Sequence, residues 1–183
     1  VNTGRNYDRY RDETGDVVLL DDVDMNGITE WTAIGTTEHP FSGKFNGKGH
    51  TIRNIAWTAD AAKSTAHGLF GVLNQASVRN LTVGGSGDRI IVRGTAAAGT
   101  AIAGVAAFAT ESVIENVANN VSISFEGEDP ADTPVMLAGI VGQMSGTTLG
   151  GQSAEAGCTN NGDITSGAIA NTGNGGKGMQ VAG

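Results

Sequence analysis

The chain has few residues that form disulfides or restrict the backbone: its 183 residues include one cysteine and 3 prolines. Cys158 has no internal partner, so a disulfide within the chain is impossible. Aromatic residues make up only 5%, which is thin support for a platform that stacks on sugars. The most apolar segment, 95–110, is short of a bilayer span and is built mainly of alanine and glycine. We therefore expect no membrane insertion.

Positive charge is scarce in the second half of the chain. Residues 94–183 hold one base, Lys177, against eight acids, whereas residues 1–93 hold 10 bases and 11 acids, and the total net charge is −8. Proteins bind nucleic acids through basic stripes that displace counterions, and anionic membranes attract basic segments. We therefore expect neither as a partner, and we interpret the acids as solubilising surface groups.

Helical periodicity is also lacking, because no segment of eleven or more residues repeats its apolar positions at a spacing of 3.6. Glycine is abundant instead, with 29 residues, several of them in Asn-Gly and Gly-Gly pairs that mark turns. The apolar stretches between these turns predict strands at 16–20, 31–35, 52–57, 68–73, 78–83, 89–92, 102–108, 113–117, 121–125, 136–141 and 158–164. Short strands without helices leave two fold classes, a β-sandwich and a β-solenoid.

A recurring pattern favours the second class. Gly-Leu-Phe-Gly at 68–71 returns as Gly-Val-Ala-Ala at 104–107 and as Gly-Ile-Val-Gly at 139–142, at intervals of 36 and 35 residues. Periods of 20 to 50 residues mark repeat architectures, and a sandwich has no need of them. We therefore predict an all-β fold, a parallel β-helix of short stacked strands, in which each side chain stacks on its counterpart in the next repeat.

The repeat also predicts which side chains are equivalent. The segment 157–164 matches 116–123 in residue type, which makes Cys158 the counterpart of Val117 and a small buried hydrophobe. Equivalent places in the three copies predict one apolar column inside the fold, formed by Leu69, Phe70, Val105, Ile140 and Val141.

These motifs resemble the GLUG-motif repeat family, named for a Gly-Leu-hydrophobic-Gly signature. The copy at 68–71 matches the signature, the copy at 138–142 matches its common Ala-Gly-Ile-Val-Gly variant, and 104–107 lacks the second glycine. The segment 19–55, with Trp-Thr-Ala-Ile-Gly at 31–35 and Phe-Ser-Gly-Lys-Phe-Asn-Gly at 41–47, is similar to the module that precedes such repeats. The resemblance implies a secreted or cell-surface bacterial or archaeal protein whose repeats form a non-catalytic stalk or adhesive region.

This resemblance defines the expected domain organisation. Residues 1–16 are a polar N-terminal lead-in or cap, and residues 17–183 are a GLUG-like β-helix repeat domain. The start at Val1 predicts that an upstream segment has been removed. The segment 179–183 matches 136–139 only as far as its glycine and then stops partway through a repeat, so we expect a fragment of a longer chain or end-to-end association with further copies.

Catalytic motifs fail when tested one by one. Gly47-Lys48-Gly49 lacks the serine or threonine of a P-loop, and Gly84-Gly85-Ser86-Gly87-Asp88 fits neither a nucleophile elbow nor the calcium nonapeptide. The histidines His39, His50 and His67 have no second metal ligand at zinc spacing, so we interpret His50 as a structural hydrogen-bonding residue. We therefore predict no catalytic residue, no cofactor-binding residue and no metal ligand.

Two acidic groups remain as hypotheses. Asp22 and Asp24 lie two apart in a strand and so share a face, and Arg53 or Arg79 could stack beside them, as in a carbohydrate-active β-helix. Carboxylate oxygens could also gather a calcium ion at Glu126, Glu128, Asp129 and Asp132, although their loop lacks EF-hand spacing.

The leading hypothesis is a non-enzymatic β-helix domain, extracellular or at a cell surface, that acts as an adhesin segment, stalk or filament building block. Its partners would be further repeats, other copies end to end, or surface glycans or proteins. The alternative is a carbohydrate-active or carbohydrate-binding β-helix. The two differ in whether acidic, basic and aromatic side chains cluster on one face.

Overall fold

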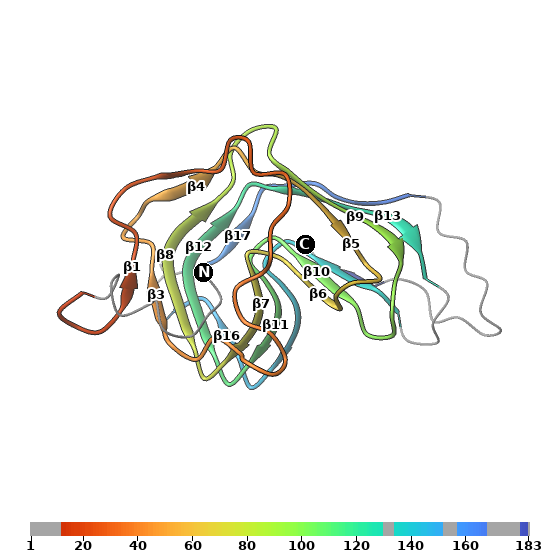
Figure 1. Cartoon of the computed structure of the whole chain (residues 1–183). Helices are drawn as coiled ribbons and strands as arrows, with labels where there is room; N and C mark the ends of the chain where they lie inside the picture. The colour runs from red at the N-terminus through yellow and green to blue at the C-terminus, as the bar shows by residue number, and fades with distance from the viewer. Residues whose placement is uncertain (1–11, 130–133, 152–156, 168–179, 183) are drawn as a thin grey trace.

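The computed structural model describes residues 12–129, 134–151, 157–167 and 180–182, and Figure 1 shows the whole chain. Every regular element in this part is a β-strand, and it contains no helix, as predicted. All strand pairs in it are parallel. The all-β, parallel part of the prediction is therefore confirmed, and the arrangement is compatible with a β-helix.

Three successive sets of strands follow the three copies of the glycine motif. The first set is β6 (Ala66–His67), β7 (Phe70–Asn74), β8 (Ser77–Val83) and β9 (Arg89–Thr95). The second set is β10 (Ala101–Ala103), β11 (Ala106–Thr110), β12 (Val113–Asn119) and β13 (Ser122–Glu128). The third set is β14 (Met136–Ala138), β15 (Val141–Ser145), β16 (Thr148–Leu149), β17 (Thr159–Asn160) and β18 (Ile164–Ser166).

Shorter strands precede and follow these sets. Before them come β1 (Val17–Val18), β2 (Val23–Asp24), β3 (Lys44–Asn46), β4 (Thr51–Arg53) and β5 (Ala56–Asp60), and after them comes β19 (Gln180–Ala182). The strands form four sheets: β1-β3-β8-β12-β16 with β2, β4 and β17 attached, β19-β14-β10-β6, β15-β11-β7, and β18-β13-β9-β5. Each set therefore contributes to every sheet, and equivalent strands run side by side (Figure 1).

The register between sets agrees with the equivalences read from the sequence. Ala118 pairs with Thr159 and Ile123 with Ile164, as the match of 116–123 to 157–164 requires. Cys158 is half-buried against the core, at the place that Val117 occupies one repeat earlier. Ala138 pairs with Ala182, so β19 adds to the sheet of β14 in the predicted alignment.

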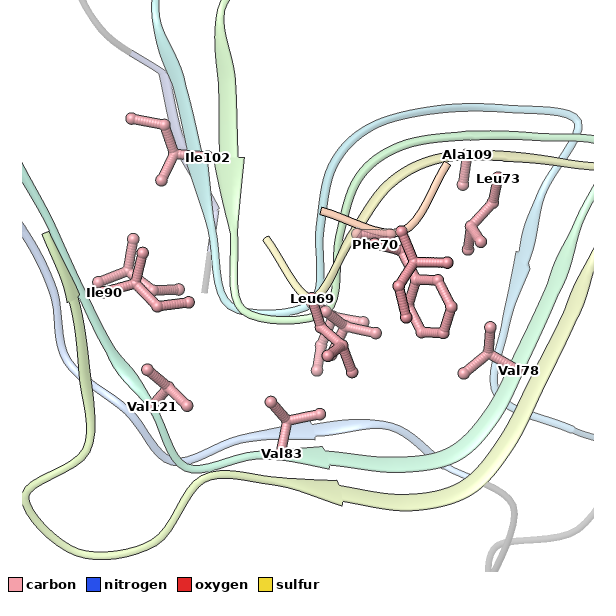
Figure 2. Close-up of a cluster of buried hydrophobic side chains, with 14 of the residues drawn as sticks. Leu69, Phe70, Leu73, Val78, Val83, Ile90, Ile102, Ala109 and Val121 are labelled. Atoms are coloured by element: carbon pink, nitrogen blue, oxygen red, sulfur yellow. The ribbon is translucent and has the colours of Figure 1, made fainter. Parts of the chain in front are cut away.

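The core fills the space that the four sheets enclose, and Figure 2 shows its side chains pointing inward from all of them.

The predicted single apolar column is wrong, because the structure divides it into two. Phe70, Ala106 and Val141 lie in one register row. Leu69, Val105 and Ile140 each precede a member of that row and form a second, buried row. Adjacent residues can both face inward because the chain bends at Leu69 (Figure 2).

Several predicted strands are divided or shortened at corners of the chain. The predicted strands 102–108 and 136–141 each divide where the motif turns, into β10 and β11 and into β14 and β15. The predicted strand 52–57 divides at Asn54, whose φ of 61° is left-handed and cannot continue an extended strand. The predicted strand 31–35 is reduced to one bridge, between Ile34 and Phe70. Apolar content alone could not reveal these corners.

In the second and third copies, the first glycine of the motif faces an asparagine of another sheet. A Cβ on Gly104 would collide with Asn119 Oδ1 and would lie 2.6 Å from the Gly139 oxygen, and a Cβ on Gly139 would collide with Asn160. Asn119 Nδ2 donates to Asn160 Oδ1 at 2.8 Å and to the Val121 oxygen at 3.0 Å. The Asn119 amide can therefore make these hydrogen bonds only if the residue that faces it, Gly104, has no side chain.

The second glycine of the motif has close neighbours in the first and third copies. A Cβ on Gly142 would lie 2.8 Å from the Ala107 oxygen and 2.9 Å from Ala101 Cβ, and a Cβ on Gly71 would collide with the Gly35 oxygen. The middle copy carries Ala107 at the equivalent position, and this alanine is buried.

A second asparagine row shapes the sheet of β8 and β12. Asn80 and Asn116 are left-handed within their strands, with φ of 53° and 51°, a conformation that asparagine tolerates better than most residues. Asn116 Nδ2 donates to Asn80 Oδ1 at 2.8 Å, and Asn80 Nδ2 donates to Asn46 Oδ1 at 3.1 Å. Each asparagine and the residue before it both point away from the core. The alternation of buried and exposed side chains then resumes with Leu81 and Val117 buried.

Gly104→Ala tests the close approach at the motif. The added methyl group collides with Asn119 Oδ1 and the Gly139 carbonyl, so we expect a loss of about 2–3 kcal/mol in the free energy of unfolding. Gly85→Ala is the matched control, because a Cβ there meets nothing within 4 Å and should change stability by less than about 0.5 kcal/mol. Urea denaturation of both variants measures the difference, and equal stability would contradict the assigned packing.

Candidate functional site

The acidic face predicted at the start of the chain is present. Asp22, directly before β2, and Asp24, at its end, are exposed, and Val23 between them packs against the core, so the two carboxylates lie on the same outer side of the chain. The parallel partner β4 places its own polar residues beside them, with Asp24 opposite Arg53. The pairing of β2 with β4, which are 29 residues apart in the chain, thus brings the polar residues of both into one charged surface.

Each carboxylate of this surface is held in its ionised form. The backbone N–H of Thr51 donates to Asp22 Oδ1 at 2.9 Å and lowers the pKa of Asp22, with further lowering from His50 and Arg53. The Asn54 amide donates to Asp24 Oδ1 at 2.8 Å and lowers the pKa of Asp24, together with the Asn26 backbone N–H. A general acid needs a raised pKa at neutral pH, and these two carboxyls have the opposite shift.

The two arginines named with this face have different positions. Arg53 Nη1 lies 3.9 Å from Asp24 Oδ2 and belongs to the face. Arg79 does not, because its guanidinium pairs with Asp16, whose side chain is buried. Arg79 therefore ties the N-terminal strands to β8 and is not available to a substrate at Asp22.

The two tryptophans form a packed pair that serves the fold. Trp31 and Trp57 stack at 5.0 Å between ring centroids, and Trp57 is only 3% exposed. Trp31 Nε1 also donates to the Leu69 oxygen at 3.1 Å, which fixes the ring over the first repeat. This pair covers the N-terminal end of the core, so Trp57 offers no flat surface to a sugar ring.

The structure adds a group of ligand atoms that the sequence did not reveal. One carboxylate oxygen each of Asp21 and Asp22 and one ring nitrogen of His50 lie within 4.8 Å of one another. His50 Nδ1 is 3.5 Å from Asp22 Oδ1. The prediction of no metal ligand considered spacing along the chain, and 28 residues separate Asp22 from His50. Only the β2–β4 pairing could have revealed the group, and both strands are short.

The acids proposed for calcium do not gather in the same way. Glu126 accepts hydrogen bonds from Arg93 at 2.9 Å, and Glu128 lies 3.4 Å from the Thr95 hydroxyl. Asp129 is buried and accepts from the Val135 backbone N–H at 3.2 Å, while Asp132 lies outside the described residues. Within the described part, these three acids form no group that could hold a metal ion. Calcium binding here stays a hypothesis.

The other histidines are separate from this surface. His39 is exposed in a turn, where its backbone N–H donates to the Thr36 hydroxyl at 3.1 Å. His67 is buried in the row that contains Ile102 and Leu137, and its Nε2 lies 2.8 Å from the Ser64 carbonyl oxygen. Burial lowers the pKa of His67, because the interior disfavours the imidazolium.

No protein-family model, no curated protein and no solved structure matches this chain. The resemblance to GLUG-motif repeat proteins therefore stays a prediction. In the part of the chain that the structure describes, no helix could span a membrane.

The buried His67 predicts a dependence of stability on pH. Its folded pKa lies below the ordinary value of 6.5, so the unfolded chain binds a proton more readily than the folded chain as the pH falls below that value. Stability is thus retained above about pH 6.5 and decreases below it. His67→Leu, which matches the apolar row, should reduce the difference in Tm between pH 7.5 and pH 5.5, whereas His39→Asn should leave it unchanged. An equal pH dependence in wild type and His67→Leu would contradict the assignment.

Proposed function

We propose that this chain is a parallel β-helix that acts as a non-catalytic domain of an extracellular or cell-surface protein, as an adhesin segment, stalk or filament building block. The observation that carries the proposal is the addition of equivalent strands from every repeat to the same four sheets. Such an arrangement grows along one axis, by about 4.8 Å for each added strand layer, and yields a rigid extended body.

Several polar side chains of the surface support the same function, because they bind one another across repeats. Arg93 binds Glu126 one repeat later, Gln75 donates to Glu111 at 3.0 Å, and Asn161 donates to Asn120 at 2.8 Å. These contacts join successive repeats, so the side chains reinforce the stacking. The ionised Asp22 and Asp24 likewise bind backbone and amide donors and do not form an acid–base pair.

A second candidate function is carbohydrate binding, and one observation favours it. A groove of about 420 Å³ is lined by Gly49, Asn80, Leu81, Thr82, Asn116, Val117, Ala118, Gly157 and Thr159. The amides of Asn80 and Asn116 could bind sugar hydroxyl groups there. However, none of these lining residues is aromatic, so a sugar ring would lack the stacking surface that usually dominates its binding.

A depolymerisation assay, run beside a glycan array, separates a non-catalytic domain from a carbohydrate-active enzyme. The structural function predicts no release of sugar products from any acidic or neutral polysaccharide, because the acidic face has no carboxyl with a raised pKa. The control variant Asp22→Asn with Asp24→Asn should behave as the wild type in both assays. Product release by the wild type that this double variant abolishes would contradict the proposal and establish an enzyme.

A further inference from the structure

Side chains from two paired strand regions converge on one point of the N-terminal surface. Asp21 and Asp22 belong to the loop between β1 and β2, and His50 directly precedes β4. Among the described residues, they alone form a group whose ligand atoms lie within 4.8 Å of one another. We propose that Asp21, Asp22 and His50 bind a divalent transition-metal ion of the zinc class.

The separation of the ligand atoms fits one ion. His50 Nδ1 and Asp22 Oδ1 are 3.5 Å apart. Two ligands that each lie about 2.0–2.1 Å from a tetrahedral zinc ion are separated by about 3.3–3.4 Å, so the ion fits between them with little movement. Asp21 completes three protein ligands, and water takes the fourth position. The ion replaces any proton on Nδ1, because only the neutral imidazole donates a lone pair.

The backbone holds these ligands in place. The Thr51 N–H donates to Asp22 Oδ1 at 2.9 Å and so fixes that carboxylate against β4. The His50 N–H donates to the Gly47 oxygen at 2.8 Å, and Val23 pairs with Ile52 in the parallel register. The ion would therefore bind a nearly preformed site, and it would join the β1–β2 loop to β4.

The local charge also matches a divalent cation. Asp21, Asp22 and Asp24 supply three negative charges, and Arg53, 3.9 Å from Asp24, compensates one of them. Lys48 is engaged 3.2 Å from Asp12. Two negative charges remain. The imidazole nitrogen distinguishes this set from a purely acidic cluster, because calcium and magnesium prefer oxygen ligands and zinc-class ions bind imidazole well.

Titration calorimetry with zinc chloride on the untagged full chain tests the proposal, with thermal melting in parallel. We expect one equivalent of zinc to bind and to raise Tm, since a ligand that prefers the folded state stabilises it. His50→Asn should weaken zinc binding at least tenfold. His39→Asn is the matched control, because His39 is exposed and lies outside the ligand group, and it should bind zinc like the wild type.

Asp21→Asn provides a second variant, because Asp21 is exposed and its loss should weaken zinc binding without unfolding the chain. Circular dichroism verifies the fold of each variant. Absence of zinc binding by the wild type, equal binding by His50→Asn, or tighter binding of calcium than of zinc would each overturn the proposal. These results do not depend on the glycan and depolymerisation assays, so the two proposals fail separately.

Discussion

Parallel backbone hydrogen bonds between equivalent positions of successive repeats are the constraint on which the whole structure depends. They place every side chain directly against its counterpart, so each repeat limits the residues that the next can carry. The row Val17, Phe45, Val78, Ile114 and Leu149 shows the result, with apolar residues throughout. Its last member is 40% exposed, because no described strand covers β16 from the far side.

Stacking explains the polar residues of the interior as well as the apolar ones. A buried amide is costly unless it is hydrogen-bonded, and an asparagine in one repeat can satisfy the asparagine of the next. Asn119 and Asn160 do this, and they leave room only for glycine at the facing corner. In the second and third copies, the first glycine of the motif and the asparagine that faces it therefore depend on each other.

The sequence was sufficient for the parts of the fold that repeat. The glycine intervals predicted parallel stacked strands, and the match of 116–123 to 157–164 predicted the register that the structure has. The corners could not be predicted, because Leu69 and Phe70 both face inward at a bend that alternation does not anticipate. The left-handed Asn80 and Asn116 also interrupt the alternation of buried and exposed side chains, and the apolar pattern does not predict this.

The candidate site was predicted in part, for a related reason. Asp22 and Asp24 share a face because strand geometry requires it, and Arg53 lies beside Asp24. Arg79, a strand residue of the same type, pairs with Asp16 instead, a contact across 63 residues. His50 joined the acidic group only through the short β2–β4 pairing. The local sequence pattern thus predicts which side chains share one face of a strand. The contacts that assemble the candidate site, by contrast, come from segments that do not repeat.

Cross-linking tests the in-register stacking most directly. In a Cys158→Ala background, cysteines at Thr82 and Ala118 occupy paired positions of β8 and β12, within the Cα separation that a disulfide requires. Cysteines at Thr82 and Glu115 form the control, displaced by three residues or about 10 Å along β12. Mass spectrometry after mild oxidation should find a nearly complete disulfide in the first variant and none in the second. A disulfide in the control, or none in the paired variant, would contradict the parallel register.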